Sequence, residues 1–416
     1  MVIKIAYITE TLLWSGLKIY KLLSNYLSPS FSIKCFYKYK YDSSINIPLD
    51  SSFIAFKTFE DLKSKIASFK PDLIHLNNAH LDPKAIVILL KHKIPIIEVL
   101  QFDDWNEYSH CITHHIAISK FLLYFIFKRY KLSKDLMKYF SVIPNPVDVE
   151  NIIVQLKEYE NYRTDSSSKR FTIGCAARPD PVKYYTPIFA KVLKLLDKKI
   201  KNWRFLAIGG IPESFRKLVR SLIEEGKVID LGPKYGSELY EALASLDVYT
   251  NFTVQGETFG AAIVEAMAVG LPVVVNGTPF TANAQTLLVD NGRNGFVANS
   301  IKGYVDAIIE LYNNEELRMK MGEIGREKAI KEYHPKKVIP MYEDVYNKVL
   351  NGVEIQNSLD LQSIKEEFIN RSKNIYDKDI KYLIDRINTY YLCRKFIAGN
   401  SNIKAIKALI KKYTKF

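Results

Sequence analysis

Two glutamates, Glu257 and Glu265, lie eight residues apart in the segment QGETFGAAIVEAMAVGLPVVVNG (255–277). The segment predicts a loop followed by a short helix that ends at Gly270, because glycine favours the carboxyl-terminal cap of a helix. A fully helical path would separate the two carboxylates by about 12 Å. Carboxylates that act together on one glycosidic bond lie about 5–9.5 Å apart. The spacing therefore favours two contacts with different parts of one extended ligand.

The start of this helix favours negative charge. The helix is expected to start at Phe259 and Gly260, between the two carboxylates, so that the backbone N–H groups of these residues lie at its amino-terminal end. Phosphate groups bind well at the amino-terminal end of a helix, where backbone N–H groups have no helical partner. A long anionic ligand with hydroxyls at both ends, such as a nucleotide sugar, fits this combination.

The same stretch resembles the E-x7-E signature of the retaining glycosyltransferase family 4, in the form E-T-F-G…E-A-M-A-x-G-x-P-V-V. The match includes several residues around the first glutamate, namely Phe259, Gly260, Glu265, Ala266, Met267, Gly270, Pro272 and Val273. The alternative is a surface helix with two solvated glutamates and a buried face of alanine and methionine. The resemblance covers about residues 1–350 and implies the GT-B architecture, in which two Rossmann-like domains face a cleft.

Length and composition agree with a two-domain α/β protein. A chain of 416 residues is too long for one core. Hydrophobic residues make up 48% and charged residues 25%, which is ordinary for a globular protein. No apolar run reaches the ~20 residues of a membrane span. The amino-terminal MVIKIAYITE is expected to form a strand rather than a signal peptide.

The cysteine spacing and the net charge indicate less about function than the motif does. The four cysteines show no C-x-x-C pairing, which fits a reducing cytoplasm and argues against a metal framework. His110, His114 and His115 lie close together, but no zinc-binding pattern accompanies them, so packing is the expected role. The net charge of +14 would suit nucleic acid, anionic lipid or a phosphorylated substrate.

Short apolar runs alternate with amphipathic stretches in both halves of the chain, which predicts parallel strands joined by crossover helices. We expect an amino-terminal Rossmann-like domain over 1–148, a linker over 149–168 and a nucleotide-sugar domain with a closing helix over 169–350. Residues 351–416 lie outside the family pattern. They predict a basic helical extension, which either docks on an anionic membrane or packs on the main body.

Arg178 and Lys183 follow the first strand of the second half, five positions apart. In the family, an arginine and a lysine at this spacing bind the donor diphosphate, in the pattern G-R-x-x-x-x-K-G. The resemblance therefore implies that both cations, with Glu257, are catalytic and stabilise the charge on the leaving diphosphate. Tyr184 replaces the glycine of that pattern. The alternative is a pair of ordinary surface cations.

The resemblance also implies contacts with the donor. Glu257 corresponds to the glutamate that holds hydroxyls of the transferred sugar, and Glu265 to the carboxylate that accepts from the ribose hydroxyls. Backbone groups near glycines are expected to recognise the nucleobase. The implied donor-binding residues are Glu265, Thr258, Phe259, Gly260, Gly16, Gly209 and Lys234.

Three further residues are candidates for contacts with the acceptor or the sugar. Ser15 lies in the turn after the first strand, where the family has a glycine-rich loop. Gln101 occupies the position at which many family members have a histidine, and it cannot carry a proton. Asp103 either positions the acceptor hydroxyl or is a solvated loop carboxylate. His75, at another strand end, is expected to be structural.

Together these features predict a retaining hexosyltransferase that moves a hexose from a nucleotide diphosphate sugar, such as a UDP- or GDP-hexose, to a glycan or lipid-linked acceptor. The resemblance implies no metal and no other cofactor. The expected location is the cytoplasm, with peripheral binding to the inner face of the membrane through the basic extension. The alternatives are a GT-B nucleotide-sugar epimerase, a binding-only pseudoenzyme and a basic nucleic-acid-binding protein, for which no motif is present.

Overall fold

The structure, a computed structural model, describes residues 2–12, 14–40, 49–78, 83–103, 105, 108–159, 170–181, 183–278, 282–298, 300–355 and 359–372. The chain divides into two compact units. The described residues of the first fall within Met1–Ile153, Thr258–Ala268 and Glu327–Phe368. Those of the second fall within Val154–Glu257, Val269–Arg326 and Ile369–Phe416.

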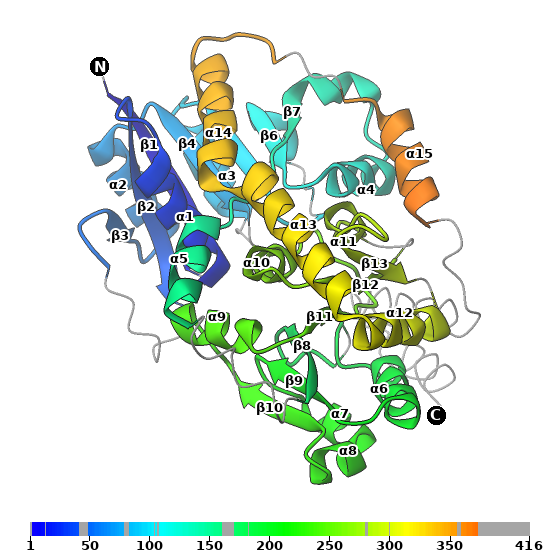
Figure 1. Cartoon of the computed structure of the whole chain (residues 1–416). Helices are drawn as coiled ribbons and strands as arrows, with labels where there is room; N and C mark the ends of the chain where they lie inside the picture. The colour runs from blue at the N-terminus through cyan, green and yellow to red at the C-terminus, as the bar shows by residue number, and fades with distance from the viewer. Residues whose placement is uncertain are drawn as a thin grey trace, which may run out of the picture. The chain divides into compact units, whose positions relative to one another are not determined.

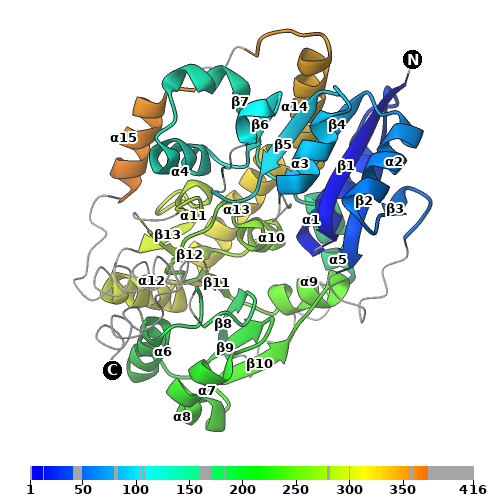
Figure 2. The same ribbon diagram turned by 180° about the vertical axis from the view of Figure 1, so that it is seen from behind.

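The described part of the first unit contains a seven-stranded parallel sheet with the order β3-β2-β1-β4-β5-β6-β7 (Figure 1 and Figure 2). Its strands are β1 (Ile3–Leu12), β2 (Phe31–Lys40), β3 (Phe53–Ala55), β4 (Leu73–Asn78), β5 (Ile96–Leu100), β6 (His114–Ala117) and β7 (Phe140–Val142). The strand order reverses between β1 and β4, and ligands of such sheets bind beyond the carboxyl ends of the strands at that point.

Some helices of this unit begin directly after a residue whose side chain caps them. The Thr58 hydroxyl accepts a hydrogen bond from the backbone N–H of Asp61, and Ser119 caps α4 in the same way. The helices are α1 (Trp14–Tyr26), α2 (Phe59–Phe69), α3 (Pro83–Leu90), α4 (Lys120–Tyr130), α5 (Val149–Tyr159), α14 (Pro335–Leu350) and α15 (Leu361–Ser372), with 3-10 turns η1 (Ser109–Cys111) and η2 (Lys134–Tyr139).

The second unit repeats the architecture. Over its described residues a six-stranded parallel sheet has the order β10-β9-β8-β11-β12-β13, which is the Rossmann arrangement (Figure 2). Its strands are β8 (Phe171–Ala176), β9 (Trp203–Ile208), β10 (Val228–Gly232), β11 (Val248–Asn251), β12 (Val273–Asn276) and β13 (Gly295–Ala298). The order reverses between β8 and β11.

The helices that alternate with these strands along the chain are α6 (Pro187–Lys199), α7 (Glu213–Leu218), α8 (Arg220–Glu224), α9 (Gly236–Ala244), α10 (Ala261–Val269), α11 (Gln285–Leu288), α12 (Ile301–Asn313) and α13 (Glu315–Tyr333). Of these, α10 as far as Ala268 and α13 from Glu327 onward fall in the first unit. Each unit has its own core. Phe189, Phe205 and Phe252 pack together in the second unit. Phe36, Ile74 and Leu76 belong to the buried cluster of the first.

The predicted fold class, α/β with two Rossmann-like sheets, is confirmed. Two details differ from the predicted boundaries. Residues 149–159 of the expected linker form helix α5, and the rest of that linker lies outside the described residues. The expected closing helix of the second domain, α14, belongs to the first unit, because it packs on α1 and its Tyr346 hydroxyl lies 2.7 Å from His75 Nδ1.

The extension is described only as far as residue 372. Phe368 of α15 packs on α4 with ring centroids 5.1 Å from Phe121 and 5.3 Å from Phe125, and Glu367 pairs with Lys120. The basic segment expected to dock on a membrane lies outside the described residues. None of the described helices combines the length and apolar character that crossing a bilayer requires.

Candidate functional site

Glu257 lies in the loop after β11, at the point where the strand order of the second sheet reverses. Its carboxylate is almost buried, with 11% of the side chain exposed. Lys183, in the loop after β8, approaches it from the neighbouring strand end. Because β8 and β11 are adjacent and parallel, their carboxyl-terminal loops meet at the same edge of the sheet.

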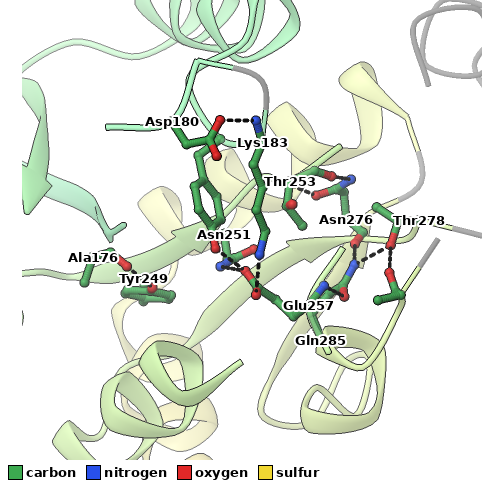
Figure 3. Close-up of polar contacts among 12 residues, drawn as sticks. Ala176, Asp180, Lys183, Tyr249, Asn251, Thr253, Glu257, Asn276, Thr278 and Gln285 are labelled. Atoms are coloured by element: carbon green, nitrogen blue, oxygen red, sulfur yellow. Dashed lines mark hydrogen bonds and ion pairs between the residues drawn. The ribbon is translucent and has the colours of Figure 1, made fainter. Parts of the chain in front are cut away.

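Both carboxylate oxygens of Glu257 are hydrogen-bonded (Figure 3). Lys183 Nζ lies 2.8 Å from Oε2. The Tyr184 hydroxyl donates to Oε1 over 2.7 Å, and Asn251 Nδ2 donates to the same oxygen over 3.3 Å. We call these four residues the Glu257 cluster. A carboxylate with this many donors stays fixed in one orientation, as a site that recognises hydroxyl groups requires.

The backbone at Glu257 is also held in place. Its N–H donates to Gln285 Oε1 over 2.9 Å, and Gln285 Nε2 in turn donates to the backbone oxygen of Asn276. Gly256, directly before the glutamate, has φ +70°. A Cβ at Gly256 would lie only 1.4 Å from the backbone oxygen of Ala282, so no other residue fits there without displacing the loop.

The two predicted diphosphate-binding cations differ in environment. Lys183 is tied into the loop, because its backbone N–H donates to Asp180 Oδ1 over 2.9 Å and its Nζ lies 4.8 Å from the Tyr184 ring centroid. Arg178 is exposed, and among the described residues its side chain has no hydrogen bond or ion pair. Arg178 and Lys183 therefore share one loop, but Lys183 alone of the two contacts Glu257.

Gly209 and Lys234, expected near the donor, follow β9 and β10. Gly209 has φ +120°, and a Cβ there would lie 2.2 Å from the backbone oxygen of Ala177. The chain therefore requires glycine at this strand end. Lys234 Nζ lies 3.5 Å from Glu238 Oε2, and the two side chains form a partly exposed ion pair.

Glu265 belongs to the first unit, on α10. Its Oε1 lies 2.7 Å from Lys18 Nζ of α1, and 11% of the glutamate side chain is exposed. The helix begins after Gly260, which has φ +100° and whose carbonyl accepts from the N–H of Ile263. Lys18 thus provides a cation beside the carboxylate that the resemblance assigns to ribose.

Phe259 and Thr258 position the start of this helix. Phe259 is buried and packs against Tyr333 with ring centroids 5.6 Å apart. The backbone oxygen of Thr258 accepts a hydrogen bond from the Ser119 hydroxyl over 2.7 Å. In this structure both residues hold the α10 loop in place.

Gln101 takes part in a cluster of amides at the strand ends of the first sheet. Its Nε2 donates to Asn77 Oδ1 over 3.2 Å, and its Oε1 accepts from Asn145 Nδ2 over 2.9 Å. A Cβ on Gly16 would lie 3.0 Å from Asn77 Nδ2, so α1 passes close to this cluster at its first turn. Ser15 is in the same turn, but its side chain is outside the described part of the chain.

Asp103 pairs with Arg129 of α4. The side chains are about 40% exposed, at 40% and 38%. This contact gives Asp103 a partner other than an acceptor hydroxyl, so its predicted positioning role has no support from the geometry.

The histidines behave as packing residues. Burial lowers the pKa of His75 to about 3, and its ring lies 4.9 Å from that of Tyr7. His114 Nε2 lies 2.8 Å from the Ser141 hydroxyl, and burial lowers its pKa to about 3 as well. His115 Nδ1 lies 2.9 Å from Glu98 Oε2 in the same core. Over the described residues, no three potential ligands are grouped so that they could hold a metal ion.

Sequence reasoning missed Asn251 and Gln285 as parts of the site. Asn251 ends β11, and a polar side chain at the carboxyl end of a buried strand is a signal that could have identified it. Gln285 opens the short helix α11 and lies 28 residues after Glu257, so no local pattern connects the two.

The match to a known protein family falls mainly in the second unit. Residues 170–314 match the family model described as Glycosyl transferases group 1. The chain is 28% identical over 241 residues to N-acetyl-alpha-D-glucosaminyl L-malate synthase of Bacillus anthracis, covering 56% of this chain and 59% of the relative. It is 30% identical over 161 residues to phosphatidyl-myo-inositol mannosyltransferase of Mycobacterium leprae, covering 37% and 40% respectively. The chain thus spans about half the length of the curated relatives it matches.

A solved structure supports the fold over most of the chain. HepE from Anabaena in complex with UDP and glucose superposes with a TM-score of 0.64 at 16% identity, covering 83% of this chain and 100% of that one. These comparisons confirm the predicted resemblance to glycosyltransferases and the GT-B fold.

Proposed function

We propose that this protein is a retaining glycosyltransferase that transfers a hexose from a nucleotide diphosphate sugar to a glycan or lipid-linked acceptor. The observation that carries the proposal is the Glu257 cluster, a buried carboxylate held by Lys183, Tyr184 and Asn251 where the strand order of the second sheet reverses. The match to Glycosyl transferases group 1 spans the same segment.

Four charged residues have chemical tasks in this reaction, two of them from the Glu257 cluster. The Glu257 carboxylate accepts a hydrogen bond from the transferred sugar and so orients its anomeric carbon. The Lys183 ammonium and the exposed Arg178 guanidinium stabilise the charge that develops on the diphosphate as the bond to the anomeric carbon breaks. Glu265 accepts from the ribose hydroxyls, as the family resemblance implies.

The family resemblance implies a front-face mechanism, in which the acceptor oxygen attacks the face from which the diphosphate leaves. The bond from the anomeric carbon to the diphosphate oxygen breaks, the bond to the acceptor oxygen forms on the same face, and the acceptor proton passes to a departing phosphate oxygen. This route needs no histidine, which agrees with Gln101 at the position where many family members have one. Gln101 and its amide neighbours remain available to orient hydroxyl groups.

Relatives support the class of donor and acceptor. The solved Anabaena protein contains UDP and glucose, which supports a nucleotide-sugar donor here. One curated relative is named N-acetyl-alpha-D-glucosaminyl L-malate synthase and another phosphatidyl-myo-inositol mannosyltransferase, and the second name supports a lipid-linked acceptor. A cytoplasmic location and membrane docking through the basic extension belong to the same proposal.

The alternatives have less support. A GT-B epimerase is disfavoured because the matching family model is one of glycosyl transferases. A binding-only protein would have no need for both the Lys183–Glu257 pair and the exposed Arg178. Nucleic-acid binding is suggested by net charge alone.

A thermal-shift screen of UDP-, GDP- and ADP-sugars tests the proposal. A donor at about 100 times its dissociation constant adds about 2.7 kcal/mol to the stability of the unit that binds it. We expect one nucleotide series to raise the melting temperature, with the intact nucleotide sugar more effective than its nucleoside diphosphate. A protein whose melting temperature responds to none of them is not a glycosyltransferase of this type.

A further inference from the structure

Tyr184 departs from the family pattern, which has glycine directly after the lysine, and its side chain contacts the glutamate assigned to the sugar. Its hydroxyl donates to Glu257 Oε1 over 2.7 Å. The ring lies 4.8 Å from Lys183 Nζ. A glycine would remove the shorter of the two hydrogen bonds to this oxygen and leave only that of Asn251 Nδ2, at 3.3 Å, so the substitution changes what Glu257 offers to a ligand.

The hydrogen-bonding capacity of Glu257 can be counted. An ionised carboxylate has about four lone-pair sites, two on each oxygen. Tyr184 and Asn251 both donate to Oε1, and Lys183 donates to Oε2. Among the described residues, no other group donates to this carboxylate. One acceptor position therefore remains, and it is on Oε2.

The Tyr184 phenol is a durable donor. Burial and the adjacent Glu257 carboxylate raise its pKa well above the ordinary value of 10.0. The phenol is therefore protonated at neutral pH and keeps its hydrogen bond to Oε1. The Asn251 amide is likewise fixed, since the residue is 2% exposed at the end of β11.

We infer that Tyr184 is a positioning residue that restricts Glu257 to a single hydroxyl of the transferred sugar and thereby sets which sugar the protein accepts. This inference rests on the proposed function and deepens it. Where Oε1 is free, a glutamate can accept from two neighbouring hydroxyls of one sugar. Here only one hydroxyl of the sugar can donate to Glu257, and a second hydroxyl needs a different acceptor. Discrimination between epimers, which differ in the direction of one hydroxyl, therefore depends on the Tyr184 phenol.

Tyr184→Phe tests the inference, because it removes the hydroxyl and keeps the ring. Tyr185→Phe is the matched control: among the described residues the Tyr185 hydroxyl is buried and has no hydrogen-bond partner. Isothermal titration would measure binding of epimer pairs to both variants and to the unmodified protein. The pairs are UDP-glucose with UDP-galactose, UDP-N-acetylglucosamine with UDP-N-acetylgalactosamine, and GDP-glucose with GDP-mannose. UDP and GDP alone serve as ligands without a sugar.

We expect the unmodified protein to discriminate within the pair whose nucleotide it binds. In Tyr184→Phe the ratio of the two dissociation constants should change by about fivefold or more, since discrimination by a polar site depends on which of its hydrogen bonds are made. Affinity for the nucleoside diphosphate alone should stay within about twofold, because the phenol acts only at the sugar end. Tyr185→Phe should reproduce the unmodified ratio.

Two results separate the possible failures. If the unmodified protein discriminates between epimers and Tyr184→Phe keeps the same ratio, Tyr184 is only a packing residue and the inference is wrong, while the proposed function stands. A matching change in Tyr185→Phe would also overturn it, since the effect would then come from the loop as a whole. If the unmodified protein binds no nucleotide sugar, the proposed function fails and the inference fails with it.

Discussion

Replacing Lys183 with methionine removes the ammonium group from the Glu257 cluster while keeping most of the side chain's length. The Nζ–Oε2 distance is 2.8 Å, and the two side chains are 16% and 11% exposed. Breaking a fully buried pair costs about 3–5 kcal/mol, whereas an exposed pair contributes about 0.2–1 kcal/mol. The partly buried Lys183–Glu257 pair falls between them, so we expect a loss of about 2 kcal/mol.

Thermal unfolding followed by circular dichroism measures this loss. For a unit of this size, 2 kcal/mol corresponds to a fall in melting temperature of about 4–8 °C. Lys234→Met is the matched control, because it removes the same charge from a pair 3.5 Å apart whose side chains are 32% and 65% exposed. Its melting temperature should change by less than about 2 °C.

A double-mutant cycle with Glu257→Gln isolates the pair itself. We expect a coupling free energy of about 1–3 kcal/mol, because the two groups are in direct contact. Lys183→Met should also weaken the binding of UDP or GDP, whereas Lys234→Met should weaken it less. If Lys183→Met melts at the temperature of the unmodified protein and the coupling is near zero, the pair does not fix Glu257 and the reasoning fails.

Three further predictions follow from the same geometry. Glu265→Ala should weaken the binding of UDP or GDP measured by titration, while Glu257→Ala should chiefly lower turnover; an unchanged affinity in Glu265→Ala would contradict the ribose assignment. The folded-state pKa of His75, about 3, lies below its ordinary value of 6.5, so the unfolded chain binds more protons and stability falls as the pH drops below about 6.5. Between about pH 7 and pH 5 His75 alone should cost about 2 kcal/mol in chemical denaturation, and a slope that does not flatten in His75→Gln would show that this histidine is not the cause. Turnover should survive EDTA, since Lys183 and Arg178 supply the positive charge; loss of activity that magnesium or manganese restores would refute this.

Local patterns were sufficient to predict the two sheets. Runs such as FTIGCA and LPVVV are almost entirely apolar, as is typical of strands buried on both faces of a sheet. Such patterns could not predict which sheet helix α14 packs on. Its Tyr346 meets His75 across 271 residues of sequence, and no periodicity within the helix specifies which sheet it packs on.

The candidate site was predictable in its charges but not in its hydrogen bonds. Lys183 and Glu257 follow adjacent strand ends, so topology alone brings them together. The direction of the Tyr184 side chain depends on the path of its loop, which hydrogen bonds such as that of the Tyr184 N–H to the Asp180 carbonyl determine. Similarly, the sequence alone suggests that the Asp103 carboxylate is available to a ligand, whereas in the structure it pairs with Arg129.

The most direct test of the central claim is the slow cleavage of a donor by water, followed by proton NMR at early times. Purified protein is incubated with the nucleotide sugar that gives the largest thermal shift, and the configuration of the released hexose is read before it equilibrates. The account predicts release of the nucleoside diphosphate with the donor's anomeric configuration retained, and a large loss of that release in Glu257→Ala. Release of the opposite anomer, or equal release by Glu257→Ala, would contradict it.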